Sequence, residues 1–461
     1  MDCFKAYDIR GKIDSEITPN FAKQLGNAFS REFNLKNCCI GHDIRLSSPE
    51  LAAAFSEGLQ DAGTNVFDLG VCGSEEIYFA TSLFNSDKYP SFDGGVIITA
   101  SHNPPEYNGF KFVRGGAIPV SKDSGLLNIK EKILNQTYTT AEPNLKGKYT
   151  KINLRTSYIN YLLSLIDLKS IKKLKILADP GNGCAGEVVK LLAKHLPCEF
   201  IFINEKPDGT FPNGVPNPLL PENRALTAKA VKESGADLGL AWDGDFDRCF
   251  FYTAKGDFVE GYYIVGLLAQ TLLQKAQNKN SSATPEKILY DTRLTWNTID
   301  MVKESGGISI EGRTGHAFMK DQMRRENAIY GGEMSAHHYF RAFSFCDSGM
   351  LPWLYLLELM SKTAKSLEEL VEERVAAYPC SGEINRKVDN AQAIMTKIQA
   401  RFEAQALKTS FIDGLSMEFK DWRFNLRCSN TEPLLRLNVE SRADYALMQK
   451  RTKELLALID V

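Results

Sequence analysis

Three alternate aspartates form the strongest chemical signal in the chain. Asp243, Asp245 and Asp247 lie on a short turn between two apolar runs. Carboxylate oxygens that converge on one point suit a hard cation such as Mg²⁺. A calcium-binding EF-hand loop would continue with glycine and then glutamate, where this sequence has Arg248 and Ala254. The spacing therefore predicts a magnesium site and excludes an EF-hand, with a solvated acidic turn as the plain alternative.

A serine follows another apolar run at the point where a buried strand would end. Ser101 is followed by His102, Asn103 and two prolines. Open α/β sheets place their chemistry at the carboxyl ends of strands. A hydrolase serine would need Gly-x-Ser-x-Gly leading into a helix, and the prolines oppose a helix here. The residues favour a hydroxyl that carries a phosphoryl group, with His102, Asn103 and Lys111 as donors, although an ordinary polar turn fits them equally well.

Two further loops have donor or acceptor groups suited to a sugar phosphate. The segment Arg427–Pro433 combines one guanidinium with hydroxyl and amide side chains, which suits a phosphate, although a plain polar loop is the alternative. Glu333 follows two glycines and can accept hydrogen bonds from two neighbouring hydroxyls. The adjacent His337 and His338 indicate a metal only weakly, because neighbouring histidines on one loop rarely reach the same ion. Segments 4–11 and 313–316 each place a hydrogen-bond donor beside a glycine. Such a pair is usually structural, so these segments indicate a binding site only in combination with the other loops.

The elements that must position these loops follow a repeated order. Residues 38–69, 175–202 and 287–310 each read as strand, acidic turn, helix, glycine and strand, and such crossovers imply parallel pairing. The glycine-rich stretch 179–186 inside the second segment is interpreted as a tight turn between strand and helix, since it lacks the residues of a P-loop. After residue 370 short strands and helices alternate differently, with Asp413-Gly414 as a hairpin turn. The prediction is three similar α/β domains followed by an α+β domain, with domains at 1–146, 147–251, 252–368 and 369–461.

Composition excludes several classes of protein. The 461 residues include 55 basic and 57 acidic side chains, a net charge of −2, which opposes a nucleic-acid-binding surface. No apolar run approaches the roughly 20 residues that span a bilayer, and the N-terminus has no secretory signal pattern. Ten scattered cysteines without a C-x-x-C pair suit a reducing compartment. We expect a cytoplasmic protein with neither nucleic-acid nor membrane partners, and the sequence leaves monomer and homodimer open.

Taken together and in this order, the four loops resemble those of the α-D-phosphohexomutase superfamily, most closely its bacterial phosphomannomutases. The resemblance covers the whole chain, with family loops at Thr99–Pro104, Asp243–Arg248, Gly332–His337 and Arg427–Thr431. It implies four domains around a central cleft, the first three α/β with mixed sheets and the last α+β.

The resemblance also implies roles for individual residues. Ser101 would be the phosphorylated serine, and Asp243, Asp245 and Asp247 would bind Mg²⁺ together with a phosphoserine oxygen. Glu333 and Ser335 would read sugar hydroxyls, and the substrate's other phosphate would be held by Arg427, Ser429, Asn430 and Thr431. Arg10, His102, Lys111 and His316 would be the acid–base candidates. The remaining supporting positions are Tyr7, Arg248, Arg293, Thr314 and His337. Ala336 and Cys428 depart from the usual family residues, and Ala336 leaves the role of His337 open.

The implied reaction interconverts mannose 6-phosphate and mannose 1-phosphate through a phosphoserine and a sugar 1,6-bisphosphate, for GDP-mannose and surface polysaccharide synthesis. Phosphoglucomutase, a dual-specificity enzyme and phosphoglucosamine mutase are the alternatives within the family. The Glu333-Met334-Ser335 form differs from the Glu-Gln-Ser typical of glucosamine enzymes. Two alternatives outside the family are disfavoured by the residues. An aspartate-nucleophile phosphatase would not need the Ser101 loop, and a non-catalytic sugar-phosphate-binding protein would not need a competent side chain at every catalytic position.

Overall fold

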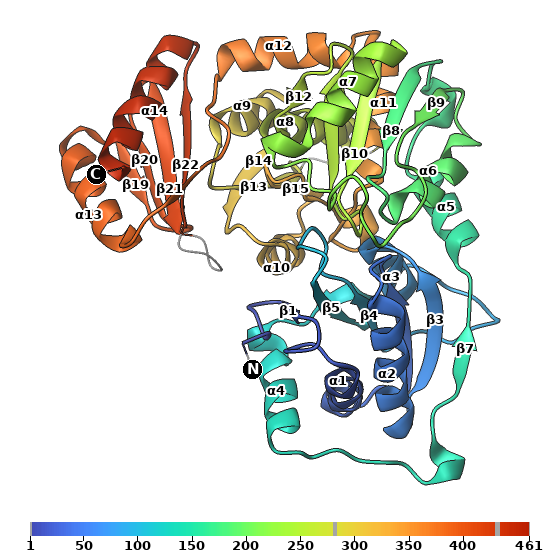
Figure 1. Ribbon diagram of the computed structural model, residues 1–461. Helices are drawn as coiled ribbons and strands as arrows, with labels where there is room; N and C mark the ends of the chain where they lie inside the picture. The colour runs from blue at the N-terminus through green and yellow to red at the C-terminus, as the bar shows by residue number, and fades with distance from the viewer. Residues whose placement is uncertain (1, 280–283, 429–433, 461) are drawn as a thin grey trace. The chain divides into compact units, whose positions relative to one another are not determined.

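The computed structural model describes residues 2–279, 284–428 and 434–460. The chain divides into two compact units, the first made of residues 1–258 and 339–362 and the second of residues 259–338 and 363–461 (Figure 1). We call them unit 1 and unit 2. The four domain boundaries given above remain a prediction.

Unit 1 begins with a mixed sheet. Its strands, in the order β1-β5-β4-β2-β3-β7 with β6 beside β5, are β1 (Ile9–Lys12), β2 (Asn37–His42), β3 (Asn65–Val71), β4 (Gly94–Ile98), β5 (Tyr107–Arg114), β6 (Ile118–Pro119) and β7 (Tyr149–Lys151). Strand β2 pairs in parallel with β3 and β4, whereas β5 runs antiparallel to β4 and β1. The turn between β4 and β5 therefore lies at the carboxyl end of a buried parallel strand.

Helices cover both faces of this sheet. Its flanking helices are α1 (Pro19–Phe33), α2 (Ser48–Asp61), α3 (Ser74–Ser82) and α4 (Leu126–Leu134). Consecutive glycines of β4 identify the faces, because successive strand positions point to opposite sides. A side chain at Gly94 would meet Phe29 of α1, whereas one at Gly95 would meet Ile77 of α3. The α1 face forms a large apolar core that includes Phe29 and Phe112, whose ring centroids lie 4.9 Å apart.

A second mixed sheet completes the positioning elements of unit 1. Its strands, in the order β12-β11-β10-β8-β9, are β8 (Lys175–Asp179), β9 (Glu199–Phe202), β10 (Leu238–Trp242), β11 (Cys249–Thr253) and β12 (Phe258–Val259). Helices α5 (Arg155–Ser164), α6 (Ala185–Ala193) and α7 (Ala225–Ser234) precede or separate these strands in the chain. The antiparallel pair β16 (His338–Phe340) and β17 (Cys346–Asp347) and helix α11 (Leu351–Thr363) come after them. The glycine-rich stretch is the predicted tight turn from β8 to α6, with left-handed Gly181 and Asn182. Strands β10 and β11 pair antiparallel, so the aspartates occupy a hairpin turn.

Unit 2 contains parallel strands and an antiparallel sheet. Strand β13 (Lys287–Asp291) pairs in parallel with β14 (Ile308–Gly312) and β15 (Tyr330–Gly332), beside helices α8 (Gly261–Lys279), α9 (Trp296–Glu304), α10 (His316–Glu326) and α12 (Leu367–Ala377). The antiparallel order β18-β22-β21-β20-β19 consists of β18 (Ile384–Lys387), β19 (Lys408–Ser410), β20 (Leu415–Glu418), β21 (Trp422–Cys428) and β22 (Leu434–Ser441). Helices α13 (Ala391–Phe402) and α14 (Tyr445–Ile459) pack on it over a core that includes Phe402 and Trp422 (Figure 1).

These elements confirm the predicted fold class. The three repeated segments are β2-α2-β3, β8-α6-β9 and β13-α9-β14, each with parallel strands. The last sheet is antiparallel with helices, and the predicted hairpin turn lies between β19 and β20 with Gly414 at φ +76°. Short 3₁₀ turns occur at Gly115–Ala117, Lys122–Ser124, Pro143–Leu145, Leu168–Ser170, Pro221–Asn223, Arg341–Phe343 and Glu403–Gln405.

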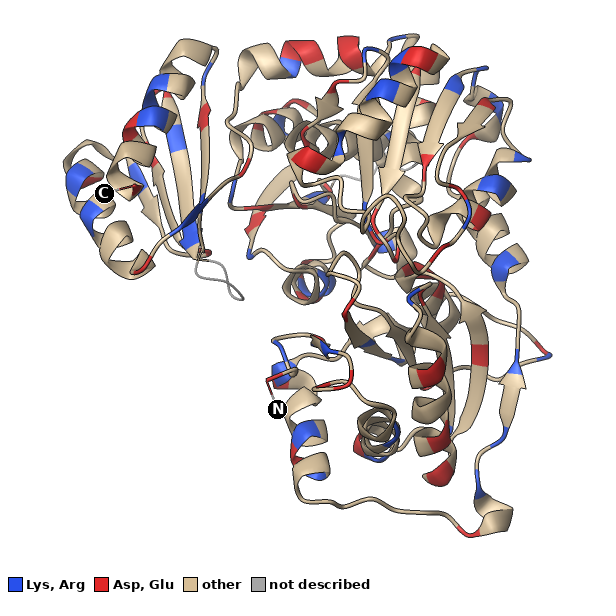
Figure 2. Cartoon of the chain, viewed as in Figure 1, with Lys and Arg blue, Asp and Glu red and all other residues tan. Residues whose placement is uncertain are grey.

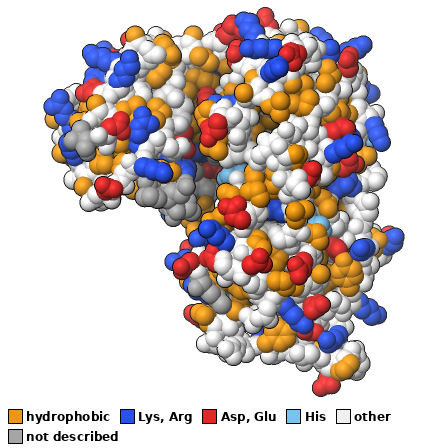
Figure 3. Space-filling model, viewed as in Figure 1, with side chains coloured by type: hydrophobic (Ala, Val, Ile, Leu, Met, Phe, Trp, Pro, Cys, Tyr) orange, Lys and Arg blue, Asp and Glu red, His pale blue; other side chains and the backbone are white. Residues whose placement is uncertain are grey.

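Surface charge follows the balanced composition. Figure 2 shows basic and acidic side chains spread over the helices, and on the face drawn in Figure 3 both signs mix with apolar groups. Within the described part of the chain, no helix is both long enough and apolar enough to cross a membrane.

Candidate active site

Two hairpin turns of unit 1 bring the predicted serine and the predicted aspartates together. Ser101 lies in the turn from β4 to β5, and its Oγ donates to Asp243 Oδ2 at 2.9 Å. A side-chain carbon at Gly244 would lie 2.6 Å from the Ser101 carbonyl oxygen, so glycine is required there by this close approach. The left-handed residue of the aspartate turn is Phe246, at φ +45°, and not Gly244.

The aspartates form one buried carboxylate cluster. Asp243, Asp245 and Asp247 each offer an oxygen within 4.8 Å of the others, and all three side chains are buried. Arg248 pairs with Asp243, its Nη2 lying 2.6 Å from Oδ2. Lys111 Nζ donates to Asp245 Oδ2 at 2.6 Å and to Asp247 Oδ2 at 2.7 Å. The cluster therefore has two cationic side chains that fix its geometry.

The donor set of this cluster fits a hard cation. Burial, together with the negative charges of Asp247 and Asp245, raises the pKa of Asp243 to about 6, although the ion pair with Arg248 lowers it. The Oδ1 atom of Asp245 is buried and has no hydrogen-bond partner among the described residues. Oxygen-only ligands, excess negative charge and a spare acceptor are the features that Mg²⁺ sites use.

Ser101 is held in an uncommon backbone conformation. Its φ is +50°, in the left-handed region that side-chain-bearing residues rarely adopt. Its Oγ lies 3.2 Å from His102 Nδ1. Burial, together with the nearby positive charges of Arg248 and Arg10, lowers the pKa of His102 well below its ordinary value. Because Arg248 Nη2 contacts His102 Nδ1 and arginine can only donate, that nitrogen accepts and the ring proton lies on Nε2.

The N-terminal segment adds Arg10 to the serine turn. Arg10 lies on β1, and its Nη1 donates to Asn103 Oδ1 at 2.6 Å while Nε donates to Asp8 at 3.0 Å. Tyr7 precedes β1 in the same segment. Unit 1 contains the predicted residues Tyr7, Arg10, Ser101, His102, Lys111, Asp243, Asp245, Asp247 and Arg248.

Sequence reasoning missed two charged residues beside the serine turn. Arg45 is 1% exposed and donates to backbone carbonyls of this turn, and Asp43 pairs with it at 3.3 Å. Both follow β2, where the sequence shows an acidic turn residue. The only available signal was a charged pair at the carboxyl end of a buried strand.

In unit 2, Glu333 follows β15 in a compact loop. Glu333 is 1% exposed, and one carboxylate oxygen accepts from Gly315 N at 2.9 Å. Ala336, the departure noted in the sequence, has a φ of +71°, where glycine would be unstrained. The adjacent histidines have different surroundings: His338 is buried against Tyr330 Oη at 2.7 Å, with a pKa lowered to about 3 by burial, whereas the His337 ring lies 6.4 Å from that of His316.

Arg293 connects the Glu333 loop to its own strand. Its Nε and Nη2 donate to Asp291 Oδ2 at 3.0 and 2.5 Å, and Nη2 reaches Ser335 Oγ at 3.2 Å. The same nitrogen lies 3.7 Å from Glu333 Oε1. Asp291 also accepts from Met334 N at 2.8 Å, so one carboxylate at the end of β13 organises both the arginine and the loop. In this unit His316 is the first residue of α10, and Thr314 precedes the helix by two residues.

Arg427 ends in a cluster of arginines around one carboxylate. Glu383 Oε2 accepts from Arg427 Nη2 at 2.8 Å and lies 3.7 Å from Arg293 Nη1, and Glu383 Oε1 lies 3.5 Å from Arg436 Nη1. Burial alone would raise the pKa of Glu383, but the three guanidinium groups bring it below its ordinary value. Arg427 Nε has no partner among the described residues. The predicted phosphate-binding residues Ser429, Asn430 and Thr431 lie outside the described residues.

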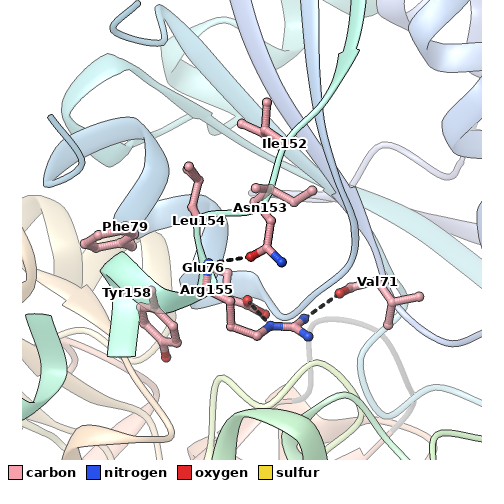
Figure 4. A pocket seen from close by; sticks show the side chains of 9 residues that line it. Val71, Glu76, Phe79, Ile152, Asn153, Leu154, Arg155 and Tyr158 are labelled. Carbon is pink, nitrogen blue, oxygen red and sulfur yellow. Dashed lines mark hydrogen bonds and ion pairs between the residues drawn. The ribbon is translucent and has the colours of Figure 1, made fainter. Parts of the chain in front are cut away.

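Unit 1 also has a cavity of about 310 Å³ away from these groups (Figure 4). It is lined by Leu69, Val71, Glu76, Phe79, Ile152, Asn153, Leu154, Arg155 and Tyr158. Its two ionised side chains pair with each other, Arg155 Nε lying 3.0 Å from Glu76 Oε1, and Arg155 also donates to the Val71 carbonyl at 2.8 Å. These contacts join β3 and α3 to the start of α5. We therefore interpret the residues around the cavity as structural and not as part of a binding site.

Known protein families match the chain throughout its length. Profiles of phosphoglucomutase/phosphomannomutase α/β/α domains I, II and III match residues 1–140, 156–256 and 260–378. The C-terminal domain of that family matches residues 383–458. The matches occur in chain order and together cover most of the sequence.

Individual relatives agree with these matches. A protein of Xanthomonas campestris pv. campestris described as phosphohexose mutases is 50% identical over 459 residues, covering 100% of this chain and 99% of that protein. The phosphomannomutase of Salmonella montevideo is 50% identical over 465 residues, with coverage of 100% and 99%. A solved phosphoglucomutase/phosphomannomutase family protein from Burkholderia thailandensis superposes with a TM-score of 0.87 at 31% identity, covering 99% of this chain and 97% of that one.

Proposed function

The chain belongs to the phosphoglucomutase/phosphomannomutase family, and from this premise we propose that it interconverts mannose 6-phosphate and mannose 1-phosphate. The observation that supports this most is the 2.9 Å contact between Ser101 Oγ and Asp243, because a phosphate on that oxygen would lie beside carboxylates suited to Mg²⁺. Glucose phosphates are the alternative substrates, alone or together with mannose phosphates.

The reaction begins with phosphorylated Ser101. The free hydroxyl of the sugar phosphate attacks the phosphorus, the bond from phosphorus to Ser101 Oγ breaks, and the electron pair stays on Oγ. The hydroxyl proton leaves to a base and Oγ gains a proton, giving free serine and a sugar 1,6-bisphosphate. After the bisphosphate turns around, Ser101 Oγ loses its proton and attacks the phosphorus of the other phosphate. The bond from that phosphorus to the sugar oxygen breaks, and the sugar oxygen gains a proton, which leaves phosphorylated Ser101 and the isomeric hexose monophosphate. The candidates for moving these protons are Arg10, His102, Lys111 and His316.

The carboxylate cluster would hold Mg²⁺. Asp243, Asp245 and Asp247, with an oxygen of phosphorylated Ser101, would be the ligands. When bound, the ion neutralises charge on the transferring phosphoryl group. Lys111 and Arg248 orient the three carboxylates through the ion pairs described above. In the dephosphorylated enzyme the Ser101 hydroxyl proton is donated to Asp243 Oδ2.

Residues of unit 2 would recognise the rest of the substrate. Glu333 and Ser335 accept from or donate to sugar hydroxyls, and Arg427 with Ser429, Asn430 and Thr431 binds the phosphate that does not react. This role is supported by the Arg427 Nε atom, which has no hydrogen-bond partner among the described residues and is a suitable donor for an anion. Supporting positions in this proposal are Tyr7, Arg248, Arg293, Thr314 and His337.

Compartment and domain boundaries belong to the same proposal. All ten cysteines are free thiols, which suits a reducing compartment such as the cytoplasm. The domains proposed at 1–146, 147–251, 252–368 and 369–461 would each contribute one family loop, and the balanced charge supports a small hexose phosphate as the partner.

Mass spectrometry and kinetics together test this function. Peptide mapping should find a phosphate on Ser101 after incubation with a hexose 1,6-bisphosphate, and incubation with hexose monophosphate should remove it. Values of kcat/KM for mannose 1-phosphate, glucose 1-phosphate and glucosamine 1-phosphate then decide the substrate. A highest value for glucose 1-phosphate would favour the alternative. A phosphate found on Asp243 in place of Ser101 would contradict the proposal and favour the phosphatase.

A further inference from the structure

The serine turn depends on hydrogen bonds from outside its own sequence. Between β4 and β5 the turn makes two internal backbone bonds, from Asn103 N to Ala100 O at 2.9 Å and from Tyr107 N to Pro104 O at 3.0 Å. Two consecutive prolines supply no N–H groups. Several carbonyls of the turn, including that of Ser101, therefore need other donors if they are to be satisfied in a buried place.

Arg45 supplies these donors. Its Nη1 donates to the carbonyls of Pro104 at 2.7 Å and Tyr107 at 3.0 Å, and its Nη2 donates to those of Ser101 at 2.9 Å and Asn103 at 2.6 Å. One planar guanidinium thus binds four carbonyls that span the whole turn. Its fixed fork of N–H groups is the only side-chain donor set that can do so, because lysine offers a single nitrogen.

Arg45 is itself held rigidly. Asp43 pairs with it at 3.3 Å and also accepts from the Arg45 backbone N–H at 3.0 Å. Ser48 Oγ donates to the same carboxylate at 2.6 Å, and Asp43 N donates to Ile98 O at the end of β4 at 2.9 Å. The Phe211 ring lies 5.3 Å from the guanidinium. The arginine is therefore anchored to the sheet that carries the serine turn.

We propose that Arg45 is a positioning residue for phosphoryl transfer, fixing the left-handed Ser101 so that its Oγ faces the carboxylate cluster. Two observations carry this inference: the direct bond from Arg45 to the Ser101 carbonyl, and the φ of +50° that Ser101 adopts in the turn. It rests on the proposed role of Ser101. Arg45 acts through the backbone and has no contact with substrate in this role.

The test measures one phosphoryl transfer at a time. Wild-type enzyme and Arg45→Lys are phosphorylated with glucose 1,6-bisphosphate, and the rate at which phosphate leaves Ser101 for mannose 1-phosphate is followed in a single turnover. Because misplacement by about 1 Å costs on the order of 100-fold in rate, Arg45→Lys should slow the transfer about 100-fold while KM changes by less than about threefold. A transfer rate within about twofold of wild type in the folded variant would overturn the proposal.

The matched control is Arg224→Lys in the same unit. Arg224 also donates to two backbone carbonyls, those of Pro218 at 2.9 Å and Leu219 at 2.8 Å, but these belong to another loop. The Arg224→Lys variant should lower the melting temperature about as much as Arg45→Lys does, and its rate of phosphoryl transfer should equal that of wild type. Equal slowing in both variants would make the effect one of general stability and overturn the proposal.

A second variant decides the question if Arg45→Lys does not fold. Asp43→Asn keeps the guanidinium but weakens its anchor, and it should slow transfer about tenfold; a wild-type rate there would overturn the proposal. The proposed function fails separately, when wild-type enzyme takes up no phosphate on Ser101 at all. The positioning role fails when wild-type and variant enzymes both take up phosphate and transfer it equally fast.

Discussion

Each unit contains its own group of candidate residues, and the two groups differ in which hydrogen-bonding atoms lack a partner among the described residues. In unit 1 the carboxylate cluster has a buried acceptor, Asp245 Oδ1, that no described residue hydrogen-bonds. In unit 2 Arg427 and Arg436 share one carboxylate, Glu383, and Arg427 Nε is a donor without a partner among the described residues. A spare acceptor among carboxylates suits a cation, and a spare donor on a guanidinium suits a phosphate. In these two groups the unpaired atoms are therefore consistent with a cation in unit 1 and an anion in unit 2.

The largest expected effect separates chemistry in unit 1 from recognition in unit 2. Ser101→Ala should lower kcat by about 10⁴-fold or more, because the phosphate carrier is lost. Ser335→Ala, which removes a hydroxyl in unit 2, should lower kcat/KM only about tenfold, the cost of one hydrogen bond. Steady-state kinetics on purified variants measure both. Losses of similar size would break the assignment of chemistry to unit 1.

The carboxylate cluster should control the requirement for metal. Replacing Asp243, Asp245 or Asp247 with Asn should raise the Mg²⁺ concentration needed for half-maximal activity by about 100-fold or more. Loss of a residue that merely hydrogen-bonds a metal ligand already costs up to about 100-fold in metal affinity, and loss of the ligand's charge should cost at least as much. Chelation should abolish wild-type activity and added Mg²⁺ should restore it. Arg427→Ala is the control from unit 2, and its Mg²⁺ requirement should match that of wild type. An unchanged requirement in all three Asn variants would remove the metal site.

Loss of Arg427 should weaken phosphate binding in both orientations of the intermediate. Arg427→Ala should lower kcat/KM about 10- to 100-fold in each direction, the value of a charge-assisted bond of roughly 1.5–3 kcal/mol. The variant should also release more bisphosphate per turnover, since the inverted ligand rebinds through the same residue. Arg427→Lys should restore little, because it lacks the paired donors. Wild-type rates without bisphosphate release would make Arg427 a structural residue of its loop.

Glu383 gives unit 2 a pH dependence with a defined sign. Its arginines hold the pKa of the folded carboxyl below the ordinary value of 4.5, so its stabilisation is present above that value and is lost as pH falls through the folded pKa. Glu383→Gln should cost about 2 kcal/mol at pH 7. Denaturant unfolding of both proteins should show this difference shrinking toward about pH 3. A difference that grows on acidification would show that the ion pairs are not stabilising.

The smallest effect concerns the left-handed residue in unit 2. Ala336→Gly should raise the free energy of unfolding by less than about 1 kcal/mol, because relief of left-handed strain is partly offset by the greater entropy of an unfolded glycine. Activity should stay within about twofold. Thermal unfolding measures the change, and marked destabilisation would show that the alanine methyl packs usefully.

Local patterns determined much of this protein from sequence alone. The alternate spacing of Asp243, Asp245 and Asp247 already placed three carboxylates on one turn, because neighbours two apart in a tight turn are close in any fold. The strand, helix and glycine order likewise fixed the three parallel crossovers, since strand and helix periodicity and right-handed connections are local or nearly local properties.

Tertiary structure decided which of these local features meet. Ser101 and Asp243 are 142 residues apart in sequence, and only the packing of two sheets in unit 1 brings their oxygens to 2.9 Å. The need for glycine at 244 arises from the Ser101 carbonyl and not from its own turn. Arg45 reaches the serine turn from another strand, and Glu383 gathers arginines from separate elements of unit 2. The family resemblance implied the meeting of Ser101 with the aspartates, but residue spacing alone encodes none of these contacts, because they depend on distances between elements that long segments separate in the chain.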